Sequence, residues 1–492
     1  MPLSFDPSAL RPSADHFIAG RRVSGGDAEI AVLRPSDLMQ ATILRDAGEP
    51  IVDLAAKAAA EALQSSGWAK ASPRERARVL HRWAELVEAR GDDLARLESL
   101  GSTRPIADTA TRDVVRTAGV IRYYAEFADK IEGAITATDA DSTCMVMAEP
   151  YGVVGAIVPW NFPIINTAWK CAPALSAGNA VVVKPSELTP LSAVALAELA
   201  IEAGLPAGLF NVVQGLGPTT GTAVVRHPLI QKISFTGATE TGAKIMAEAA
   251  LHGTKPVTLE LGGKSPQLVL KDVRGLDTVA QNVANGFLYN AGQVCTAGSR
   301  LIVHRAQADE LVERVITIAK SRKPGPTWHE DTSLSPIVSE RQAKRLETLL
   351  SRTLAEGAMV ITGGKRHSGP NAGIYFEPTV LANVSEDSTG FRDEFFGPVM
   401  SVHPYEDEEQ AIAMANHPVY GLAASLYTDD ARKALSVPRR IEAGVVWINA
   451  HGRQPEYTAP QGGFRQSGFG KDMGRAGLEG YLRYKTLWYA HG

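Results

Sequence analysis

Short runs of β-branched residues alternate with helical patterns through the middle of the chain. Val153–Val158 and Ala180–Val183 are apolar throughout, which is typical of buried parallel strands. The segment that follows reads as a helix that Thr189 caps and Gly204 ends. Further strands alternate with helices beyond it, so the pattern predicts a doubly wound parallel sheet of the α/β class over residues 151–262.

Helical patterns precede this sheet, and a second α/β series follows it over residues 266–447. Ser72 and Pro73 are typical of a helix start, and one apolar stripe then recurs at helical spacing. The stripe consists of Val79, Leu80, Trp83, Leu86 and Val87. Another helix is expected over residues 113–131, with strand-like residues at 134–150. Tyr481–Tyr489 alternates aromatic and polar residues, as an edge strand that needs a partner does.

Composition favours a large protein with a well-formed core. The chain has 492 residues, of which 45% are hydrophobic and 21% charged, with a formal net charge of −4. These values argue against disorder and against a nucleic-acid partner. The longest apolar run, near Val153–Pro159, is far shorter than the ~20 residues of a membrane span. The N-terminus lacks the pattern of a signal peptide, so no membrane partner is expected either.

The three cysteines are Cys144, Cys171 and Cys295. They are too few and too scattered for a disulfide framework, and no Cys or His cluster has zinc-ligand spacing. We therefore expect no metal and a reducing, cytoplasmic compartment.

Two groups in the chain can carry chemistry. Gly237–Gly242 follows an expected strand and opens a helix, so its N–H groups can face phosphate, although neither a Walker A nor a GxGxxG pattern is present. Small residues around Cys295 leave room for a substrate carbon at sulfur; the alternative is an inert buried thiol. Glu260 lies between two leucines at a strand end, where burying a carboxylate costs free energy of folding. The residue is therefore expected to have a catalytic use, or else to accept hydrogen bonds from the glycine amides that follow.

Six short motifs occur in order along the chain. They are Pro159–Pro163 (PWNFP), Lys184–Glu187 (KPSE), Phe235–Gly237 (FTG), Leu259–Gly263 (LELGG), Gly292–Cys295 (GQVC) and Glu394–Pro398 (EFFGP). One such motif would be weak, whereas six in order are specific. The series resembles the NAD(P)-dependent aldehyde dehydrogenase superfamily, and the resemblance covers nearly the whole chain.

The resemblance implies a role for each matching residue. Cys295 would be the nucleophile, Asn161 and the Cys295 backbone N–H would form the oxyanion hole, and Glu260 would activate water. Lys184 and Glu187 would hold the adenosine ribose. The resemblance also implies that Lys184 is one of the catalytic residues. The other cofactor positions are Trp160, Gly237 at the pyrophosphate, and Glu394 with Phe396 at the nicotinamide ribose.

The implied reaction is oxidation of a small aldehyde to a carboxylic acid through a thiohemiacetal and a thioester, with hydride transfer to NAD and hydrolysis by water. The Glu187 carboxylate favours a free ribose 2′-hydroxyl, so NADP is disfavoured. A CoA-acylating relative is disfavoured because Glu260 supplies the base for hydrolysis. A non-catalytic relative of the same fold is disfavoured because Cys295, Glu260 and Asn161 are all present.

Besides a mild change at Asp393–Glu394, two departures from the family pattern bear on the site. Ala238 stands where the family usually has Ser, which removes one side-chain hydrogen bond to the pyrophosphate. The loop over residues 450–460 is unusual: Arg453 can pair with a carboxylate and favour a semialdehyde acid, whereas Glu456 and Tyr457 suit a cationic aldehyde. Both charges can equally face solvent, so the choice of aldehyde stays open.

The resemblance also implies three structural units. A cofactor domain is expected from residues 1–130 with 151–262, and a catalytic domain from residues 263–465. An oligomerisation arm is expected from residues 131–150 with the C-terminal strand of 466–492. An arm of this kind covers an edge strand, so a homodimer or homotetramer is expected.

Overall fold

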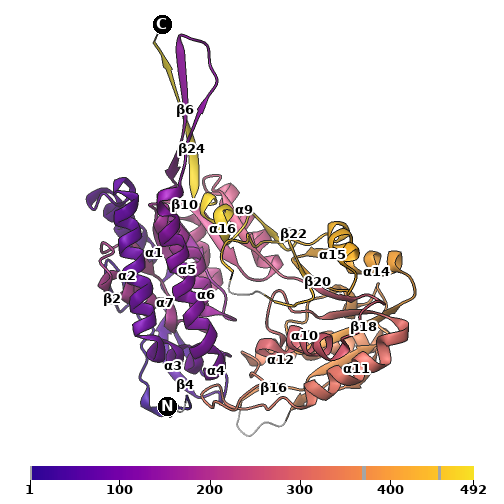
Figure 1. Ribbon diagram of the computed structural model, residues 1–492. Helices are drawn as coiled ribbons and strands as arrows, with labels where there is room; N and C mark the ends of the chain where they lie inside the picture. Colours follow the sequence, from indigo (N-terminus) through magenta and orange to yellow (C-terminus); the bar gives the residue numbers. More distant parts are fainter. Residues whose placement is uncertain (1–2, 368–372, 453–455, 492) are drawn as a thin grey trace.

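Two sheets and a projecting β-ribbon organise the structure, a computed structural model that describes residues 3–367, 373–452 and 456–491 (Figure 1). The sheets lie in two lobes, and the ribbon extends from the first lobe with the C-terminus at its far end. This architecture confirms the α/β class expected from the sequence.

The first sheet has eight strands, and its central strands are parallel. In spatial order they are β2 (Arg21–Val23), β1 (His16–Ile18), β9 (Phe210–Val212), β8 (Ala180–Lys184), β7 (Val153–Ile157), β10 (Ile230–Thr236), β11 (Val257–Glu260) and β23 (Gly468–Phe469). The chain builds outward from β7 through β8 to β9 and then returns to add β10 and β11 on the other side. The order of the strands therefore reverses between β7 and β10, as in the predicted doubly wound sheet.

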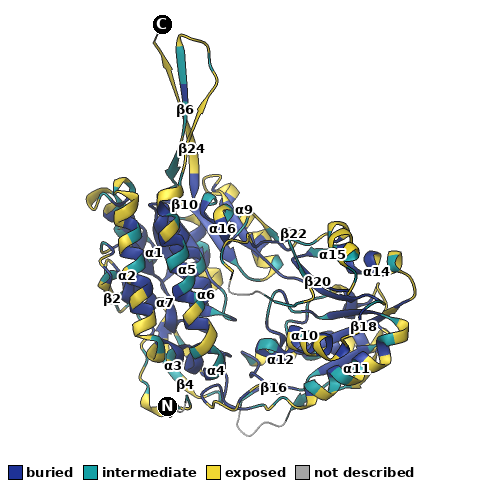
Figure 2. Ribbon diagram, viewed as in Figure 1, coloured by how far each residue is buried: buried dark blue, intermediate teal, exposed yellow. Residues whose placement is uncertain are grey.

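Helices cover both faces of this sheet, which is buried between them (Figure 2). The helices of this lobe are α1 (Gly48–Ser65), α2 (Pro73–Ala89), α3 (Gly91–Gly101), α4 (Ile106–Asp108), α5 (Val114–Phe127), α6 (Pro163–Ser176), α7 (Leu191–Glu202), α8 (Thr222–Arg226), α9 (Thr239–Leu251) and α16 (Gly474–Glu479), of which α2 and α5 pack on other helices. The Ser72 hydroxyl caps α2 by accepting from the Arg74 N–H at 3.3 Å, and every residue of the predicted stripe is buried. Among the described residues, no helix is both long and apolar enough to cross a bilayer.

The expected cap of α7 is wrong. Pro190 itself occupies the cap position, no side chain caps the helix, and the Thr189 hydroxyl is buried without a hydrogen-bond partner. Thr189 lies one residue too early, because a capping oxygen must reach the N–H of the second or third helical residue.

The second sheet has seven strands, of which only the edge strand β14 runs antiparallel to its neighbour. In order they are β14 (Met359–Thr362), β17 (Thr379–Ala382), β18 (Val399–Tyr405), β13 (Arg300–His304), β12 (Pro266–Val269), β20 (Ala423–Tyr427) and β21 (Val445–Ile448). Its helices are α10 (Leu276–Leu288), α11 (Arg305–Lys320), α12 (Glu340–Ala355), α13 (Thr389–Arg392), α14 (Glu408–Ala415) and α15 (Ala431–Ser436). The second α/β series is thus confirmed.

The projecting ribbon joins the C-terminal strand to an internal hairpin. β24 (Leu482–Ala490) pairs along its whole length with β6 (Ser142–Pro150), which also pairs with β5 (Ala134–Thr136). This is the pairing expected from the sequence, and β24 is exposed along almost all of it (Figure 2). Short two-stranded sheets complete the fold: β3 (Glu29–Leu33) with β4 (Gln40–Arg45), β15 (Arg366–His367) with β16 (Tyr375–Phe376), and β19 (Tyr420–Gly421) with β22 (Phe464–Arg465). The domain limits stay a prediction.

A buried ion pair fastens the segment before α16 to the first lobe. Lys170 Nζ on α6 lies 3.1 Å from Asp472 Oδ2 and donates to the Ser234 hydroxyl, also at 3.1 Å. Burial lowers the pKa of the neighbouring Lys232 to about 8, and Asp472 opposes that shift. One carboxylate therefore balances two buried ammonium groups.

Asp472→Asn should destabilise the protein strongly because it leaves Lys170 buried without its carboxylate. Removing one partner of a buried pair costs about 3–5 kcal/mol, whereas an exposed pair contributes about 0–1 kcal/mol. We expect a clear fall in the apparent midpoint of thermal unfolding, and almost none for the matched control Glu479→Gln, whose pair with Arg475 is exposed. Equal shifts for the two variants would contradict the assignment.

Candidate active site

The cysteine predicted to react lies on the loop that joins α10 to β13 in the second lobe. Cys295 follows the turn at Tyr289–Gly292 and is partly exposed, whereas Cys144 and Cys171 are buried. Asn290, Ala291 and Gly292 have φ values of 50°, 50° and 69°. A Cβ atom on Gly292 would collide with the Gly397 carbonyl, so this position requires glycine.

Asn161 is fastened to this loop from the first lobe. Its side-chain Nδ2 donates to the Gln293 carbonyl at 3.0 Å, two residues before Cys295. Asn290 Nδ2 donates in return to the Asn161 carbonyl at 3.1 Å, and the Thr103 hydroxyl donates to Asn290 Oδ1 at 2.8 Å. The predicted oxyanion donor and the predicted nucleophile are thus brought onto neighbouring segments.

The second lobe holds the same loop through Gln293, which is fully buried. Its Nε2 donates to the carbonyls of Asn290 and Pro336, each at 3.0 Å, and its Oε1 accepts from the Val338 N–H at 3.0 Å. The loop that carries Cys295 is therefore fixed from both sides.

Glu260 ends β11, and the glycines that follow it reach the cysteine loop before the chain enters β12. A Cβ atom on Gly263 would lie 2.6 Å from the Cys295 carbonyl oxygen, so the two segments are in contact. One on Gly462 would lie 2.9 Å from Glu260 Oε1, which places the carboxylate against that backbone. The predicted base and the predicted nucleophile lie on touching loops.

Three of the predicted cofactor residues follow the carboxyl ends of adjacent parallel strands. Trp160 follows β7, Lys184 ends β8 and Gly237 follows β10. Ligands of open α/β sheets bind beyond these ends, where the strand order reverses, and here that point lies between β7 and β10. The observed topology therefore gathers these residues where a dinucleotide would be expected.

Lys184 and Glu187 form a pair beside that point. Lys184 Nζ donates to Glu187 Oε2 at 3.3 Å. Burial lowers the pKa of Lys184, and the Glu187 carboxylate opposes this shift. The Lys184 side chain is buried, whereas about a quarter of the Glu187 side chain (24%) is exposed and can meet a ligand.

The helix after Gly237 begins without a side-chain cap. Its cap residue is Ala238, and no side-chain oxygen accepts from the first turn of α9. The backbone N–H groups of such a turn suit an anion. A Cβ atom on Gly237 would collide with the Phe235 ring, so this glycine is also required by packing.

Glu394 and Phe396 lie against the loop that follows Glu260. Glu394 Oε1 accepts from the Gly263 N–H at 3.1 Å, and Phe396 packs edge-on against Trp160 at 5.2 Å between ring centroids. Burial raises the pKa of Glu394 to about 7, and the Gly263 N–H opposes the rise. Glu394 therefore touches the segment that follows Glu260, and Phe396 touches the predicted cofactor residue Trp160.

The sequence reasoning missed the residues that fix this region. Gln293 lies within the GQVC motif and Asn290 lies just before it. In the sequence both are ordinary polar loop residues, and their role is known only from the conformation of the turn at Tyr289–Gly292. Lys264, which follows the LELGG motif directly, donates to the Asp393 carbonyl at 2.6 Å. Burial lowers its pKa to about 7. Its place directly after the LELGG motif was the one signal that the sequence offered for it.

The residues predicted to choose the substrate are only partly described. Arg453 lies outside the described residues. The Glu456 carboxylate accepts from the Thr458 N–H at 2.7 Å and from its hydroxyl at 2.6 Å. Tyr457 turns inward onto α5, where its hydroxyl lies against Gly119.

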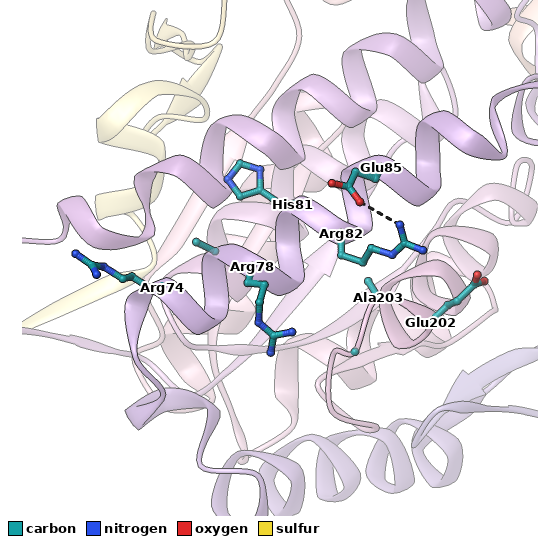
Figure 3. A pocket seen from close by; sticks show the side chains of 9 residues that line it. Arg74, Arg78, His81, Arg82, Glu85, Glu202 and Ala203 are labelled. Carbon is teal, nitrogen blue, oxygen red and sulfur yellow. Dashed lines mark hydrogen bonds and ion pairs between the residues drawn. The ribbon is translucent and has the colours of Figure 1, made fainter.

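A surface recess of about 750 Å³ lies elsewhere, between α2 and the end of α7 (Figure 3). Arg74, Arg78, His81 and Glu202 help to line it, and its lining includes none of the predicted site residues. Within the described part of the chain, no group of three or more His, Cys, Asp or Glu side chains is placed to hold a metal ion.

Known proteins match this chain over nearly its whole length. The family described as "Aldehyde dehydrogenase family" matches residues 23–487. An aldehyde dehydrogenase of Emericella nidulans is 40% identical over 97% of this chain and 95% of its own.

Two solved structures resemble the fold closely. Gamma-glutamyl-gamma-aminobutyraldehyde dehydrogenase from Burkholderia cenocepacia has a TM-score of 0.96 and 40% identity, covering 99% of this chain and 98% of its own. The NAD+ complex of an aldehyde dehydrogenase from Bacillus cereus has a TM-score of 0.96 and 37% identity, with both chains covered completely (100%). The chain belongs to the aldehyde dehydrogenase family.

Proposed function

We propose that this chain oxidises an aldehyde to a carboxylic acid with NAD, through a covalent intermediate on Cys295. The observation that carries the proposal is the bond from Asn161 Nδ2 to the Gln293 carbonyl, which holds an amide beside the cysteine loop. An amide nitrogen has two N–H donors, so a second N–H remains for an oxyanion.

The first step is attack of the Cys295 thiolate on the aldehyde carbonyl. The negative charge that develops on oxygen is received by Asn161 Nδ2 and the Cys295 N–H. Preorganised donors of this kind are worth about 3 to 4 kcal/mol each in the transition state. The turn at Asn290–Gly292 and the bonds of Gln293 keep the loop in place, so little reorganisation is needed.

The residues at the strand ends fit a dinucleotide. Lys184 and Glu187 would hold the adenosine ribose, the uncapped start of α9 the pyrophosphate, and Glu394 with Phe396 the nicotinamide ribose, beside Trp160. When bound, NAD supplies the acceptor for the hydride that leaves the thiohemiacetal carbon. Among known relatives, the Bacillus cereus enzyme forms an NAD+ complex, which supports this choice.

The last step is hydrolysis of the thioester on Cys295. Glu260 takes a proton from water, which then attacks the acyl carbon and releases the acid and the thiolate. The contact of Gly263 with the Cys295 carbonyl supports this role, since it holds the Glu260 loop against the acyl site. Lys184 contributes to this scheme by holding the cofactor. It does so together with Glu187, to which its ammonium group donates a hydrogen bond.

The ribbon provides the surface for self-association. Tyr484, Leu487, Trp488 and Tyr489 on β24 are all exposed, and they are apolar or aromatic. β24 is also the outer strand of its sheet. Covering this edge with a second copy would give the homodimer or homotetramer expected for the protein. We also propose a reducing, cytoplasmic compartment, because the chain has only three scattered cysteines.

Cys295→Ala should abolish aldehyde oxidation and leave NAD binding nearly intact, because the thiol carries the covalent step. We expect turnover below a few per cent of the parent, measured as NADH absorbance, with an NAD dissociation constant close to the parent value. Cys144→Ala is the matched control, since this cysteine lies on the ribbon. Steady turnover by the alanine variant at position 295 would overturn the assignment.

Glu260→Gln should separate hydride transfer from hydrolysis. We expect a rapid burst of NADH followed by slow turnover, with an acyl-enzyme detectable by intact mass. Added CoA should not restore turnover. Loss of the burst would instead mean that Glu260 activates the thiol.

Glu187→Gln should narrow the preference for NAD over NADP. A 2′-phosphate beside Glu187 would meet a like charge, and at an effective dielectric of about 20 two charges about 4 Å apart repel by about 4 kcal/mol. The exposed part of Glu187 can rotate away from the 2′-phosphate. We therefore expect a preference for NAD rather than exclusion of NADP. The measurement is the ratio of kcat/KM for the two cofactors, with Glu202→Gln as the control. An unchanged ratio would show that Glu187 is not the selector.

A further inference from the structure

A buried arginine lies where two segments of the proposed site meet. Arg104 belongs to the short loop between α3 and α4, and its side chain is fully buried. Its guanidinium lies 4.6 Å from the centroid of the Phe162 ring and 4.5 Å from that of the Tyr289 ring. Phe162 directly follows Asn161, and Tyr289 directly precedes Asn290. One side chain therefore contacts both the segment of the proposed oxyanion donor and the turn before the nucleophile.

Hydrogen bonds fix the orientation of this guanidinium. Arg104 Nε and Nη2 donate to the two carboxylate oxygens of Asp113 at 2.8 and 3.1 Å, and Nη2 also donates to the Tyr289 hydroxyl at 2.5 Å. The Phe162 and Tyr289 rings stack on each other, with 27° between their planes and 5.9 Å between their centroids. A planar guanidinium can pair with a carboxylate and lie over aromatic rings at the same time. The arginine therefore links the two rings to each other.

Two residues close to Arg104 in the chain contact the same two segments. The Thr103 hydroxyl donates to Asn290 Oδ1 at 2.8 Å. Glu98 is buried on α3, and its Oε1 accepts from the Ile164 N–H in the first turn of α6 at 3.0 Å. The cap residue of α6 supplies no side-chain hydrogen bond, so the Glu98 carboxylate satisfies one of the N–H groups that a helix start leaves open. One short stretch of chain thus holds both segments.

The charge of Arg104 is balanced inside the protein. Its pair with Asp113 is buried on both sides, and Asp108 lies 3.6 Å from Nη2. Among the described residues, Nη1 is the one nitrogen of this guanidinium without a hydrogen-bond partner, and it is buried. The contact of Arg104 with the site therefore runs through the Phe162 and Tyr289 rings.

We infer that Arg104 is a positioning residue for the proposed reaction, because it holds the segment of Asn161 against the turn that leads to Cys295. This inference rests on the proposed function and adds a residue that belongs to none of the six motifs. By keeping the Phe162 and Tyr289 rings together, the guanidinium fixes how far the proposed donor lies from the reacting sulfur. Oxyanion donors act at about 2.7–3.1 Å, and a misplacement of about 1 Å can lower a rate about a hundredfold.

Arg104→Lys tests this role directly. Lysine keeps a positive charge for Asp113 but loses the planar fork that also lies over the rings. We expect kcat/KM for aldehyde oxidation to fall about tenfold to a hundredfold, as for other misplaced catalytic groups. The rate of NADH formation in the first turnover should fall as well, because attack on the aldehyde forms the oxyanion. The NAD dissociation constant should stay close to the parent value.

Arg34 offers a matched control. It also forms a two-bond pair, with Asp37, and lies 5.3 Å from the centroid of an aromatic ring, that of Trp328. None of these three residues belongs to the segments of the proposed site. Arg34→Lys should therefore leave kcat/KM near the parent value even if its thermal midpoint falls. Circular dichroism and the thermal midpoint show whether each variant is folded.

A double-mutant cycle separates positioning from a purely structural effect. Asn161→Ala removes the donor that Arg104 is inferred to position, so adding Arg104→Lys should then lower kcat/KM hardly further. A general loss of folded protein would instead lower kcat/KM by the same factor in both backgrounds. If Arg104→Lys does not fold, Phe162→Leu takes its place in the cycle, since it removes one ring and keeps the pair with Asp113.

The outcomes distinguish the failure of this inference from that of the proposed function. In a parent that oxidises aldehydes with NAD, equal factors in the two backgrounds would overturn the inference alone, as would parental turnover by Arg104→Lys. A parent that oxidises no aldehyde with NAD would overturn the proposed function, and the inference with it. A factor that disappears in the Asn161→Ala background supports both.

Discussion

The cysteine loop depends on a small set of amide contacts between the two lobes. Asn290 and Ala291 adopt left-handed backbone conformations that cost about 1–3 kcal/mol each and persist only when their surroundings fix them. The Asn290 side chain supplies that constraint through Thr103 and Asn161, and Gln293 supplies it from the other lobe. The same bonds place the Asn161 amide, so the strained turn and the proposed oxyanion donor cannot be changed independently.

Local patterns predicted the fold well because they report local structure. The β-branched runs became β7 and β8, and the stripe around Trp83 became the buried face of α2. The start of α7 was wrong because Pro190, with φ −80° and ψ −7°, takes the cap position that a threonine normally occupies. Both residues can be read in the sequence. Which of them takes the cap position of α7 depends on the path by which the chain enters the first lobe.

The site could be predicted only as far as its motifs extend. The motifs supplied Cys295, Glu260 and Asn161, whereas the contacts that hold these residues join distant parts of the chain. Asn290 and Asn161 are 129 residues apart, as are Lys264 and Asp393. Periodicity carries no information about such pairs, because they exist only once the two sheets are packed.

Two buried groups beside the proposed nicotinamide position titrate near neutrality. Burial brings the pKa values of Glu394 and Lys264 to about 7, so the region proposed for the nicotinamide exchanges protons in the working range. The charge on the cofactor side of the site therefore varies with pH around neutrality, and binding of the nicotinamide ribose at Glu394 would vary with it.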